Sequence, residues 1–317
     1  MNQTDQNNQR KMNKKIFIST TTFAKYSNES LKLLENARIN YDLNPYSRKL
    51  NEYEIKKILK EDDYHGLIAG TEPLTKRVLR AAKSLKVISR VGVGIDNIDL
   101  DAARELGIKV FSTPDAPTDA VAELTIGLIL NALRRVNLAD RNMRKGIWKK
   151  EMGSLFKGKT LGIIGFGRIG RRVTELAKNF GVEVIFSDIQ KIETTLARQV
   201  PLEELLKFSD IITIHASGKN TIISKKEIEQ IKDGAILINA ARGGMIDEEV
   251  LYDALVSGKL SYAAIDTFVK EPYKGKLTGL ENVILTPHIG SYAKEARIRM
   301  EIEAVENLIK GFLDDSS

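Results

Sequence analysis

Three polar side chains of the sequence follow apolar runs that we expect to form strands. Arg242 follows the run AILINAA, Glu271 comes shortly after YAAID, and His288 follows Pro287 at the end of VILT. An arginine at such a place can hold a carboxylate through two parallel hydrogen bonds. A histidine beside a carboxylate can exchange a proton with a carbonyl or hydroxyl oxygen. Together the three residues predict proton-transfer chemistry on a small anionic molecule. Each residue alone would more often be a surface charge or part of a structural ion pair.

A glycine-rich turn, G-x-G-x-x-G, follows the apolar run LGII at Gly165, Gly167 and Gly170. In this pattern the first glycine permits a tight turn and the second lets the backbone approach a pyrophosphate. The third lets the following helix pack closely on the strand. The N-terminus of that helix offers free N–H groups and the positive end of its dipole. The turn therefore predicts a dinucleotide site, provided that strands and a helix surround it.

An acidic residue, Asp188, stands at the end of the next apolar run, VEVIF. A carboxylate at this place accepts hydrogen bonds from the hydroxyls of the adenine-side ribose and would repel a 2′-phosphate. Ile189 and Gln190 follow it, so no arginine or lysine that could bind such a phosphate directly follows the acid. The residues therefore favour NAD over NADP. The alternative is that Asp188 only caps a turn.

The other two histidines of the chain, His65 and His215, are weaker candidates for chemistry. His65 lies among charged residues before a predicted strand, and we expect it at the surface. His215 ends the run IITIH, so it is expected at the carboxyl edge of the sheet, where ligands bind in folds of this kind. For His215 we expect a structural or cofactor-facing role in place of proton transfer.

Short apolar runs alternate with amphipathic segments along most of the chain, which predicts parallel sheets with crossover helices. A proline-containing connection at 112–120 separates two such series, so two α/β domains are expected. One unusually apolar helix is expected at 119–144, either as a spacer between domains or buried in a dimer. The expected strands are 16–19, 65–70, 85–94, 108–111, 161–165, 182–186, 211–215, 235–239, 262–266 and 283–286, and further helices are expected at 31–36 and 293–313.

The composition of the 317-residue chain excludes several classes of function. The chain has no cysteine and therefore neither disulfides nor thiolate chemistry, which fits a cytoplasmic protein. Of the formal net charge of +7, +3 lies in residues 1–15 and the remaining +4 is spread along the chain, which argues against nucleic-acid binding. No apolar run is long enough to cross a membrane. Residues 1–14 are polar, lack the apolar core of a secretory signal, and are expected to form a disordered tail. We assign no metal site.

The order of the motifs gives a more specific result than the glycine turn. From about residue 16 to 313 the chain resembles the D-isomer-specific 2-hydroxyacid dehydrogenase family, and in particular its phosphoglycerate dehydrogenase-like branch. The resemblance is carried by SRVGVGIDNIDL (89–100), VAEL (121–124), GIW followed by FKGKTLGIIGFGRIG (146–170), INAARGGMIDE (238–248), AAIDTFVKEP (263–272) and TPHIG (286–290).

The resemblance implies two doubly wound parallel-sheet domains. A flavodoxin-like substrate domain would be discontinuous and comprise 15–113 and 289–317. A Rossmann domain at 114–288 would bind NAD, and the apolar helix near its start would build a homodimer. The implied reaction moves a hydride between the nicotinamide and C2 of a small 2-hydroxy or 2-oxo acid.

The resemblance also implies a role for each site residue. His288 would be the general acid in reduction and the base in oxidation, Glu271 would orient it, and Arg242 would bind the substrate carboxylate and carbonyl oxygen. The Gly-rich turn after 85–90 would offer backbone N–H groups to the carboxylate, as a nest does. The substrate-binding set is then Arg90, Val91, Gly92 and Val93. The cofactor-binding set is Gly165, Gly167, Arg168, Ile169, Gly170, Asp188, His215, Ala240 and Asp266.

Two departures from the family pattern bear on cofactor contacts and substrate. The family's H-x-P-L loop is His215-Ala216-Ser217-Gly218 here and looks shortened. Gly70 stands where phosphoglycerate-type relatives can carry an arginine, which leaves Arg90, Arg48 and Lys149 as possible sources of charge for a phosphate. The leading expectation is 3-phosphoglycerate oxidation in serine biosynthesis. The alternatives are a glyoxylate, hydroxypyruvate or other 2-oxo acid reductase, and a non-catalytic NAD-sensing protein similar to the corepressors that share this fold.

Overall fold

The computed structural model describes residues 14–218 and 220–314 of the chain. These residues fall into two compact units, and the chain passes between the units after Pro117 and after Ser291. Sequence analysis places the two divisions after Thr113 and after His288. Unit 1 contains both ends of the described chain, and unit 2 is Thr118–Ser291. Of the predicted N-terminal tail, all but Lys14 lies outside the described residues.

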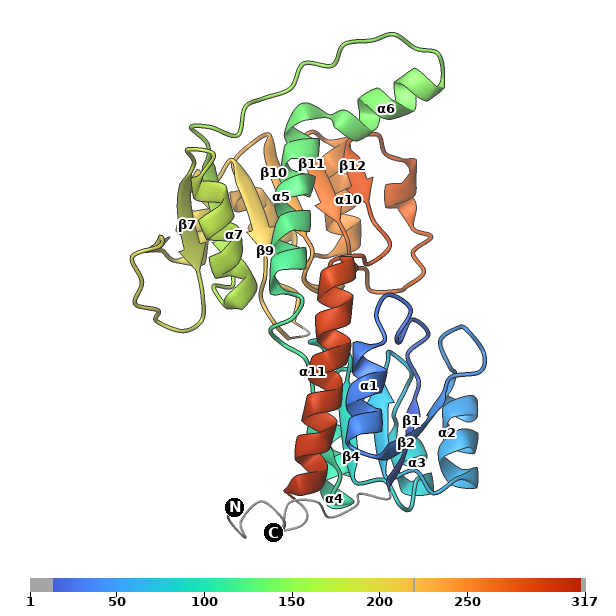
Figure 1. Ribbon diagram of the computed structural model, residues 1–317. Coiled ribbons are helices and arrows are strands. Elements are labelled where there is room, and N and C mark those ends of the chain that lie inside the picture. Colours follow the sequence, from blue (N-terminus) through green and yellow to red (C-terminus); the bar gives the residue numbers. More distant parts are fainter. Residues whose placement is uncertain (1–13, 219, 315–317) are drawn as a thin grey trace. The chain divides into compact units, whose positions relative to one another are not determined.

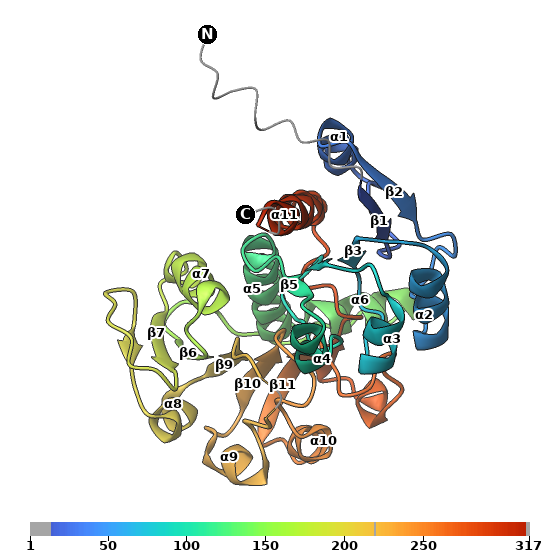
Figure 2. The same cartoon turned by 90° about the horizontal axis from the view of Figure 1, so that it is seen from below.

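Unit 1 is built on a five-stranded sheet in which every strand pair is parallel, in the order β2-β1-β3-β4-β5. Helices α1 and α11 cover one face of this sheet and α2, α3 and α4 cover the other (Figure 2). The strands are β1 (Lys14–Ile18), β2 (Ile39–Leu43), β3 (Gly66–Ala69), β4 (Val87–Arg90) and β5 (Lys109–Phe111), and the helices are α1 (Glu29–Asn36), α2 (Glu52–Glu61), α3 (Lys76–Ala81), α4 (Leu100–Glu105) and α11 (Lys294–Leu313).

Unit 2 is built on a seven-stranded parallel sheet in the order β12-β11-β10-β9-β6-β7-β8. Helices α5 and α7 lie on one face, and α8, α9 and α10 lie on the other (Figures 1 and 2). The strands are β6 (Thr160–Ile164), β7 (Glu183–Ser187), β8 (Arg198–Gln199), β9 (Ile211–Ile214), β10 (Ala235–Asn239), β11 (Leu260–Ile265) and β12 (Val283–Leu285). The helices are α5 (Thr118–Arg134), α6 (Val136–Arg144), α7 (Arg168–Lys178), α8 (Leu202–Phe208), α9 (Lys225–Gln230), α10 (Glu248–Val256) and the short 3₁₀ helix η1 (Lys276–Gly279).

The central strands of unit 2 are buried along their whole length, as strands covered by helices on both faces must be. β9 and β10 consist almost entirely of apolar residues, and none of their residues is exposed. This is why apolar runs alone located the strands, and all six strands predicted in this part of the chain are confirmed. Two strands without a continuous apolar run, β2 and the two-residue β8, were not predicted.

The predicted single helix at 119–144 is wrong, because the structure has two helices there. Helix α5 ends at Arg134, Arg135 adopts a left-handed conformation with φ of +52°, and α6 begins at Val136. The Asn131 side chain accepts a hydrogen bond from the Asn137 N–H at 2.9 Å and stabilises the break. Neither glycine nor proline marks this place, so the periodic pattern continues through it. Within the described part of the chain, every helix is too short or too polar to span a membrane.

Candidate active site

His288 and Glu271 form a pair at the carboxyl edge of the unit 2 sheet. His288 lies just past β12, and its ring Nδ1 is 3.1 and 3.0 Å from the two carboxylate oxygens of Glu271. Because a carboxylate only accepts, the ring hydrogen belongs on Nδ1 and the Nε2 atom is left for a reacting oxygen. Both side chains are open to solvent, 49% exposed for His288 and 40% for Glu271. The pair can therefore exchange a proton with a bound molecule.

A buried carboxylate, Asp266, holds the turn that carries His288. One of its oxygens accepts the Thr286 hydroxyl at 2.6 Å and the Ile289 N–H at 2.8 Å, and the other accepts the Gly290 N–H at 2.9 Å. Asp266 is fully buried, and His288 has an unusual positive φ of +54°. Three hydrogen bonds from a rigid strand end fix this turn on both sides of the histidine. In this structure Asp266 acts as a positioning residue, and the predicted contact with the cofactor remains a prediction.

Arg242 lies in the turn after β10, the neighbour of β11 in the sheet. Asn239, the last residue of β10, shapes this turn with both ends of its amide. Its oxygen accepts the Ala241 N–H at 3.0 Å, and its nitrogen donates to the Arg242 carbonyl at 2.9 Å. Sequence analysis missed Asn239, although a polar residue closing an apolar strand was a usable signal. Ala240, predicted to contact the cofactor, is buried in this turn.

The turns that carry Arg242 and Glu271 pack against each other. A side chain at Gly243 would overlap the backbone of Phe268, so this position needs a glycine. The Phe268 N–H in turn donates to Glu271 at 3.1 Å. The edge of the sheet thus brings Arg242, Glu271 and His288 into one region of unit 2, as sequence analysis predicted from their places after strands. An arginine for a carboxylate and a carboxylate-oriented imidazole suit reduction of a 2-oxo acid or the reverse oxidation.

The glycine turn has the geometry that a dinucleotide requires. Gly165 has φ of +90°, and a Cβ there would lie 2.5 Å from the Ala216 nitrogen. A Cβ at Gly170 would overlap the Gly165 carbonyl oxygen, so helix α7 could not pack on β6 as it does. Gly167, in contrast, has open space where a Cβ would be, and no side chain caps α7. The uncapped helix end, including the N–H groups of Arg168 and Ile169, leaves room and donors for a pyrophosphate, and these residues fit NAD.

Asp188 stands next to the glycine turn at the end of β7. Its carboxylate accepts the Phe166 N–H at 2.7 Å and the Gln190 N–H at 2.9 Å. The structure thus shows the turn-capping role that sequence analysis kept as the alternative. Each oxygen has a second lone pair, so the same carboxylate can also accept from a ribose hydroxyl. The two capping contacts hold the Asp188 carboxylate beside the glycine turn, where contact with a ribose hydroxyl requires it.

His215 follows β9 and lies half-buried beside the glycine turn. Its ring Nε2 is 3.0 Å from the Thr213 hydroxyl, and burial lowers its pKa to about 3. The ring is therefore neutral at physiological pH and is unsuited to donate a proton. Its backbone N–H donates to the Ile164 carbonyl at 2.7 Å, which fastens this segment to the end of β6. These contacts agree with the structural or cofactor-facing role that the sequence predicted.

The Gly-rich turn of unit 1 is less open than sequence analysis expected. The Val91 N–H donates to the Ala69 carbonyl at 2.9 Å, and the Gly92 N–H donates to the Thr113 hydroxyl at 2.8 Å. Both N–H groups therefore donate to partners inside unit 1. The predicted binding of a substrate carboxylate by backbone N–H groups is restricted to the part of the turn from Val93 onward. Val93 itself is 39% exposed. Arg90 lies over Gly92, and its guanidinium donates to the Val91 carbonyl.

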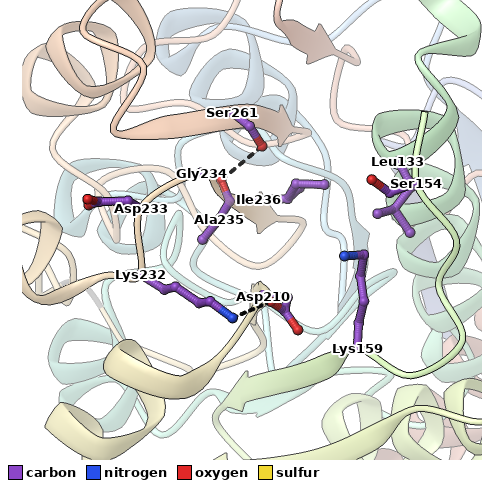
Figure 3. A pocket seen from close by; sticks show the side chains of 10 residues that line it. All are labelled: Leu133, Ser154, Lys159, Asp210, Lys232, Asp233, Gly234, Ala235, Ile236 and Ser261. Atoms are coloured by element: carbon purple, nitrogen blue, oxygen red, sulfur yellow. Dashed lines mark hydrogen bonds and ion pairs between the residues drawn. The ribbon is translucent and has the colours of Figure 1, made fainter. Parts of the chain in front are cut away.

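A small cavity of about 90 Å³ lies at the opposite, amino edge of the unit 2 sheet. Lys159, Asp210 and Ala235 stand at the beginnings of β6, β9 and β10, and an ion pair of 2.7 Å joins Lys232 to Asp210 (Figure 3). The cavity lies at the other end of the strands from His288, and no histidine lines it. It has no part in the site. Among the residues that the structure describes, no cluster of His and acidic side chains could hold a metal ion.

Comparison with known proteins decides the family. Residues 126–290 match the family described as "D-isomer specific 2-hydroxyacid dehydrogenase, NAD binding domain". The chain belongs to this family. It is therefore an NAD-dependent oxidoreductase, and the matched region lies within unit 2, where the glycine turn and the His288–Glu271 pair were found.

Individual relatives differ in the substrate that they are named for. A hydroxypyruvate reductase of Thermotoga maritima is 42% identical over 292 residues, which cover 89% of this chain and 94% of the relative. A D-3-phosphoglycerate dehydrogenase of Methanocaldococcus jannaschii is 40% identical over 282 residues, 84% of this chain but only 53% of the relative. The crystal structure of a D-lactate dehydrogenase from Aquifex aeolicus, complexed with NAD and lactic acid, has a TM-score of 0.80 at 29% identity and covers 95% of this chain and 96% of its own.

Proposed function

We propose that this 2-hydroxyacid dehydrogenase reduces a short, unphosphorylated 2-oxo acid, with hydroxypyruvate first and glyoxylate second. The observation that carries the chemistry is the His288–Glu271 pair, with both carboxylate oxygens within 3.1 Å of Nδ1. In reduction, NADH supplies the hydride for C2. His288 gives its Nε2 proton to the carbonyl oxygen, which becomes the new hydroxyl. Glu271 orients the ring through Nδ1, and Arg242 binds the carboxylate of the substrate. The products are the D-2-hydroxy acid and NAD⁺.

The two units have different tasks in this proposal. Unit 2 holds the cofactor and the acid–base pair, and unit 1 binds the substrate through the turn that contains Val93. Glycine turns that leave N–H groups facing outward suit the substrate carboxylate. The first test of these separate tasks is the variant Val93→Pro, which removes one backbone N–H. It should raise the KM for the acid and leave the KM for NADH unchanged.

The contacts of the candidate phosphate ligands favour an unphosphorylated substrate. Sequence analysis named three cations that could bind a phosphate, and each of them interacts with a carboxylate of the chain. A cation that is already compensated attracts a further anion weakly. The pairs are Arg48 with Glu54 at 2.6 and 2.8 Å, Lys149 with Glu151 at 2.7 Å, and Arg90 with Glu72 through their charges.

Oxidation of 3-phosphoglycerate in serine biosynthesis was the leading expectation from the sequence. It is now the second candidate function, after reduction of an unphosphorylated 2-oxo acid. Its support is the 40% identity with the Methanocaldococcus jannaschii enzyme. The present chain spans about half the length of that relative, whereas it spans nearly all of the Thermotoga maritima hydroxypyruvate reductase. The contacts of the three cations are the observation that supports hydroxypyruvate as the first candidate.

The test follows the absorbance of the reduced nicotinamide in the purified protein. The oxo acids are hydroxypyruvate, glyoxylate and 3-phosphohydroxypyruvate with NADH, and the hydroxy acids are D-glycerate, D-lactate and 3-phosphoglycerate with NAD⁺. We expect the highest kcat/KM with hydroxypyruvate. A higher value with 3-phosphohydroxypyruvate would establish the second candidate in its place. No turnover with any of the six acids would contradict both.

A homodimer is also part of the proposal, formed through the segment 136–155 of unit 2. Helix α6 in this segment has no buried residue. Apolar side chains that stay exposed on one continuous segment mark an interface. They are Val136, Met143, Ile147, Trp148, Met152 and Leu155, with Trp148 80% and Met152 86% exposed. Light scattering is expected to give twice the monomer mass for the native protein and the monomer mass for a Trp148→Glu, Met152→Glu variant. We place the dimer in the cytoplasm.

A further inference from the structure

The carboxyl edge of the unit 1 sheet contains a topological switch point. Strand β1 lies between β2 and β3, so the chain leaves β1 and β3 toward opposite faces of the sheet. In doubly wound sheets the crevice between two such strand ends is where ligands, often anionic ones, are bound. Here the two strand ends are followed by Ser19 and Gly70.

A carboxylate of the chain itself occupies this crevice. Glu72 accepts a hydrogen bond from the Ser19 hydroxyl at 2.5 Å and from the Gly70 N–H at 3.2 Å. Glu72 is 1% exposed and Ser19 is 2% exposed. The donors that could receive an external anion at the switch point are thus satisfied by an internal one.

Arg90 brings the balancing charge from the end of β4, the neighbour of β3 in the sheet. Burial raises the pKa of Glu72, and the hydrogen bond from Ser19 and the positive charge of Arg90 act in the opposite direction. The Arg90 guanidinium also donates to the Val91 carbonyl, in the turn assigned to the substrate. Burial has the largest effect, so the pKa of Glu72 is raised overall, and its carboxyl group lies near the positive charge that borders this turn.

Glu72 also explains the glycine at position 70. A Cβ at Gly70 would lie 2.9 Å from Oε2 of Glu72, closer than real side chains approach. A larger side chain at this position therefore requires the Glu72 carboxylate to move from its present place. In that place Glu72 fills the space beside Gly70 and faces the charge of Arg90.

From this arrangement we infer that Glu72 is a specificity-determining residue that keeps substrates with a second anionic group out of unit 1. The inference rests on the proposed function, because it assumes that the turn after Arg90 receives the substrate. A phosphate near this turn would face a guanidinium and a buried carboxylate with no net positive charge. A pair without net charge offers a dianion little attraction to offset the loss of its hydration, so a phosphorylated substrate binds weakly there. A neutral hydroxyl substituent, as in hydroxypyruvate, is not affected.

The test compares two substrates in the same full-length enzyme, so that general damage cancels. Glu72→Gln removes the charge and keeps the shape of the side chain. We expect the ratio of kcat/KM for 3-phosphohydroxypyruvate to that for hydroxypyruvate to rise about tenfold or more. Inorganic phosphate, as a competitive inhibitor of hydroxypyruvate reduction, should also bind the variant more tightly than the native enzyme.

The matched control is Glu301→Gln. Glu301 is another glutamate of unit 1 with 2% exposure, and its carboxylate accepts the Ala24 N–H, in the loop after β1, at 2.9 Å. Its substitution should leave the ratio unchanged. If Glu72→Gln fails to fold, Glu72→Ser serves as the second variant. The preference of the native enzyme for hydroxypyruvate, again about tenfold or more, tests the inference without any variant.

Each outcome has a separate meaning. A rise of the ratio in Glu72→Gln but not in Glu301→Gln supports the inference. An equal fall of both activities in Glu72→Gln shows that Glu72 is only structural and overturns the inference, and the proposed function survives. A native enzyme that prefers the phosphorylated acid overturns it as well. No turnover of either acid by the native enzyme contradicts the proposed function and the inference together.

Discussion

The two sheets have equivalent switch points that treat anions in opposite ways. In unit 2, the ends of β6 and β9 meet at Gly165 and Ala216, and Gly167 next to them leaves open space at an uncapped helix end. In unit 1, the ends of β1 and β3 meet at Ser19 and Gly70, and the space is filled by Glu72. The switch point of unit 2 has room for the pyrophosphate of a cofactor, whereas that of unit 1 is occupied by the carboxyl group of Glu72.

The comparison shows that topology places a crevice but side chains decide whether it binds. The same distinction holds for the charged groups beside the crevices. His288 and Glu271 are about half exposed and can meet a substrate, whereas Glu72 is buried. A carboxylate next to a basic side chain is therefore open to bound molecules in unit 2 and enclosed in unit 1. Four predictions test this contrast.

The largest effect is expected for His288→Ala. Loss of the proton donor should lower kcat by a factor of about 10² to 10⁴, because general acid–base catalysis contributes this much. The affinity for NADH should remain, since the glycine turn is untouched, and a fluorescence titration measures it. Unchanged turnover would show that the open carboxyl edge of unit 2 is not where protons are transferred.

A smaller loss is expected for Glu271→Gln, about tenfold or more in kcat, since the amide keeps the shape but no longer stabilises the positive ring. Glu248→Gln is the matched control. Glu248 accepts the Val269 N–H at 2.8 Å in the same region and does not contact the histidine. Equal losses in the two variants would show that Glu271 acts only through the general charge of this edge.

The third prediction concerns the open switch point and compares two glycines of one turn. Gly167→Ala places a methyl group in empty space, so the melting temperature should hold while the KM for NADH rises. Gly170→Ala places the same group against the Gly165 carbonyl, which should destabilise unit 2 by about 1–3 kcal/mol. Normal NADH binding by a folded Gly167→Ala variant would contradict the assignment of the pyrophosphate to this turn.

The smallest effect is a pH dependence of stability from His215. Its folded pKa of about 3 lies below the ordinary value of 6.5, so the unfolded chain binds a proton that the folded chain does not. Between these two values the free energy of unfolding falls as the pH falls, by on the order of 1 kcal/mol per pH unit at most. Urea denaturation at pH 7 and pH 5.5 should show a smaller decrease in the free energy of unfolding for His215→Asn than for the native protein. His288→Ala, which removes an exposed histidine, serves as the control. An equal decrease in the free energy of unfolding in the native protein and in His215→Asn would show that burial does not hold the ring neutral.

Most of the fold could be predicted because its signals are local. The buried strands of a parallel sheet are apolar along their whole length, so β9 and β10 are visible as runs of letters. The turn at Gly165 was equally clear, since the structure confirms the steric reasons predicted for Gly165 and Gly170 and leaves open space at Gly167. Strand β2 lacked such a run, and the break at Arg135 lacked glycine or proline, so both escaped prediction.

The sequence by itself determined the chemistry of this protein, because the order of its motifs places an arginine, a glutamate and a histidine after strands that share one edge. Only the tertiary structure decided which groups meet. Glu271 reaches Nδ1 of His288 because the turns after β11 and β12 are fixed by Asp266 and Phe268. Glu72 reaches the Ser19 hydroxyl because β1 and β3 are neighbours. Contacts of this kind depend on strand order and loop paths, which no run of neighbouring residues encodes.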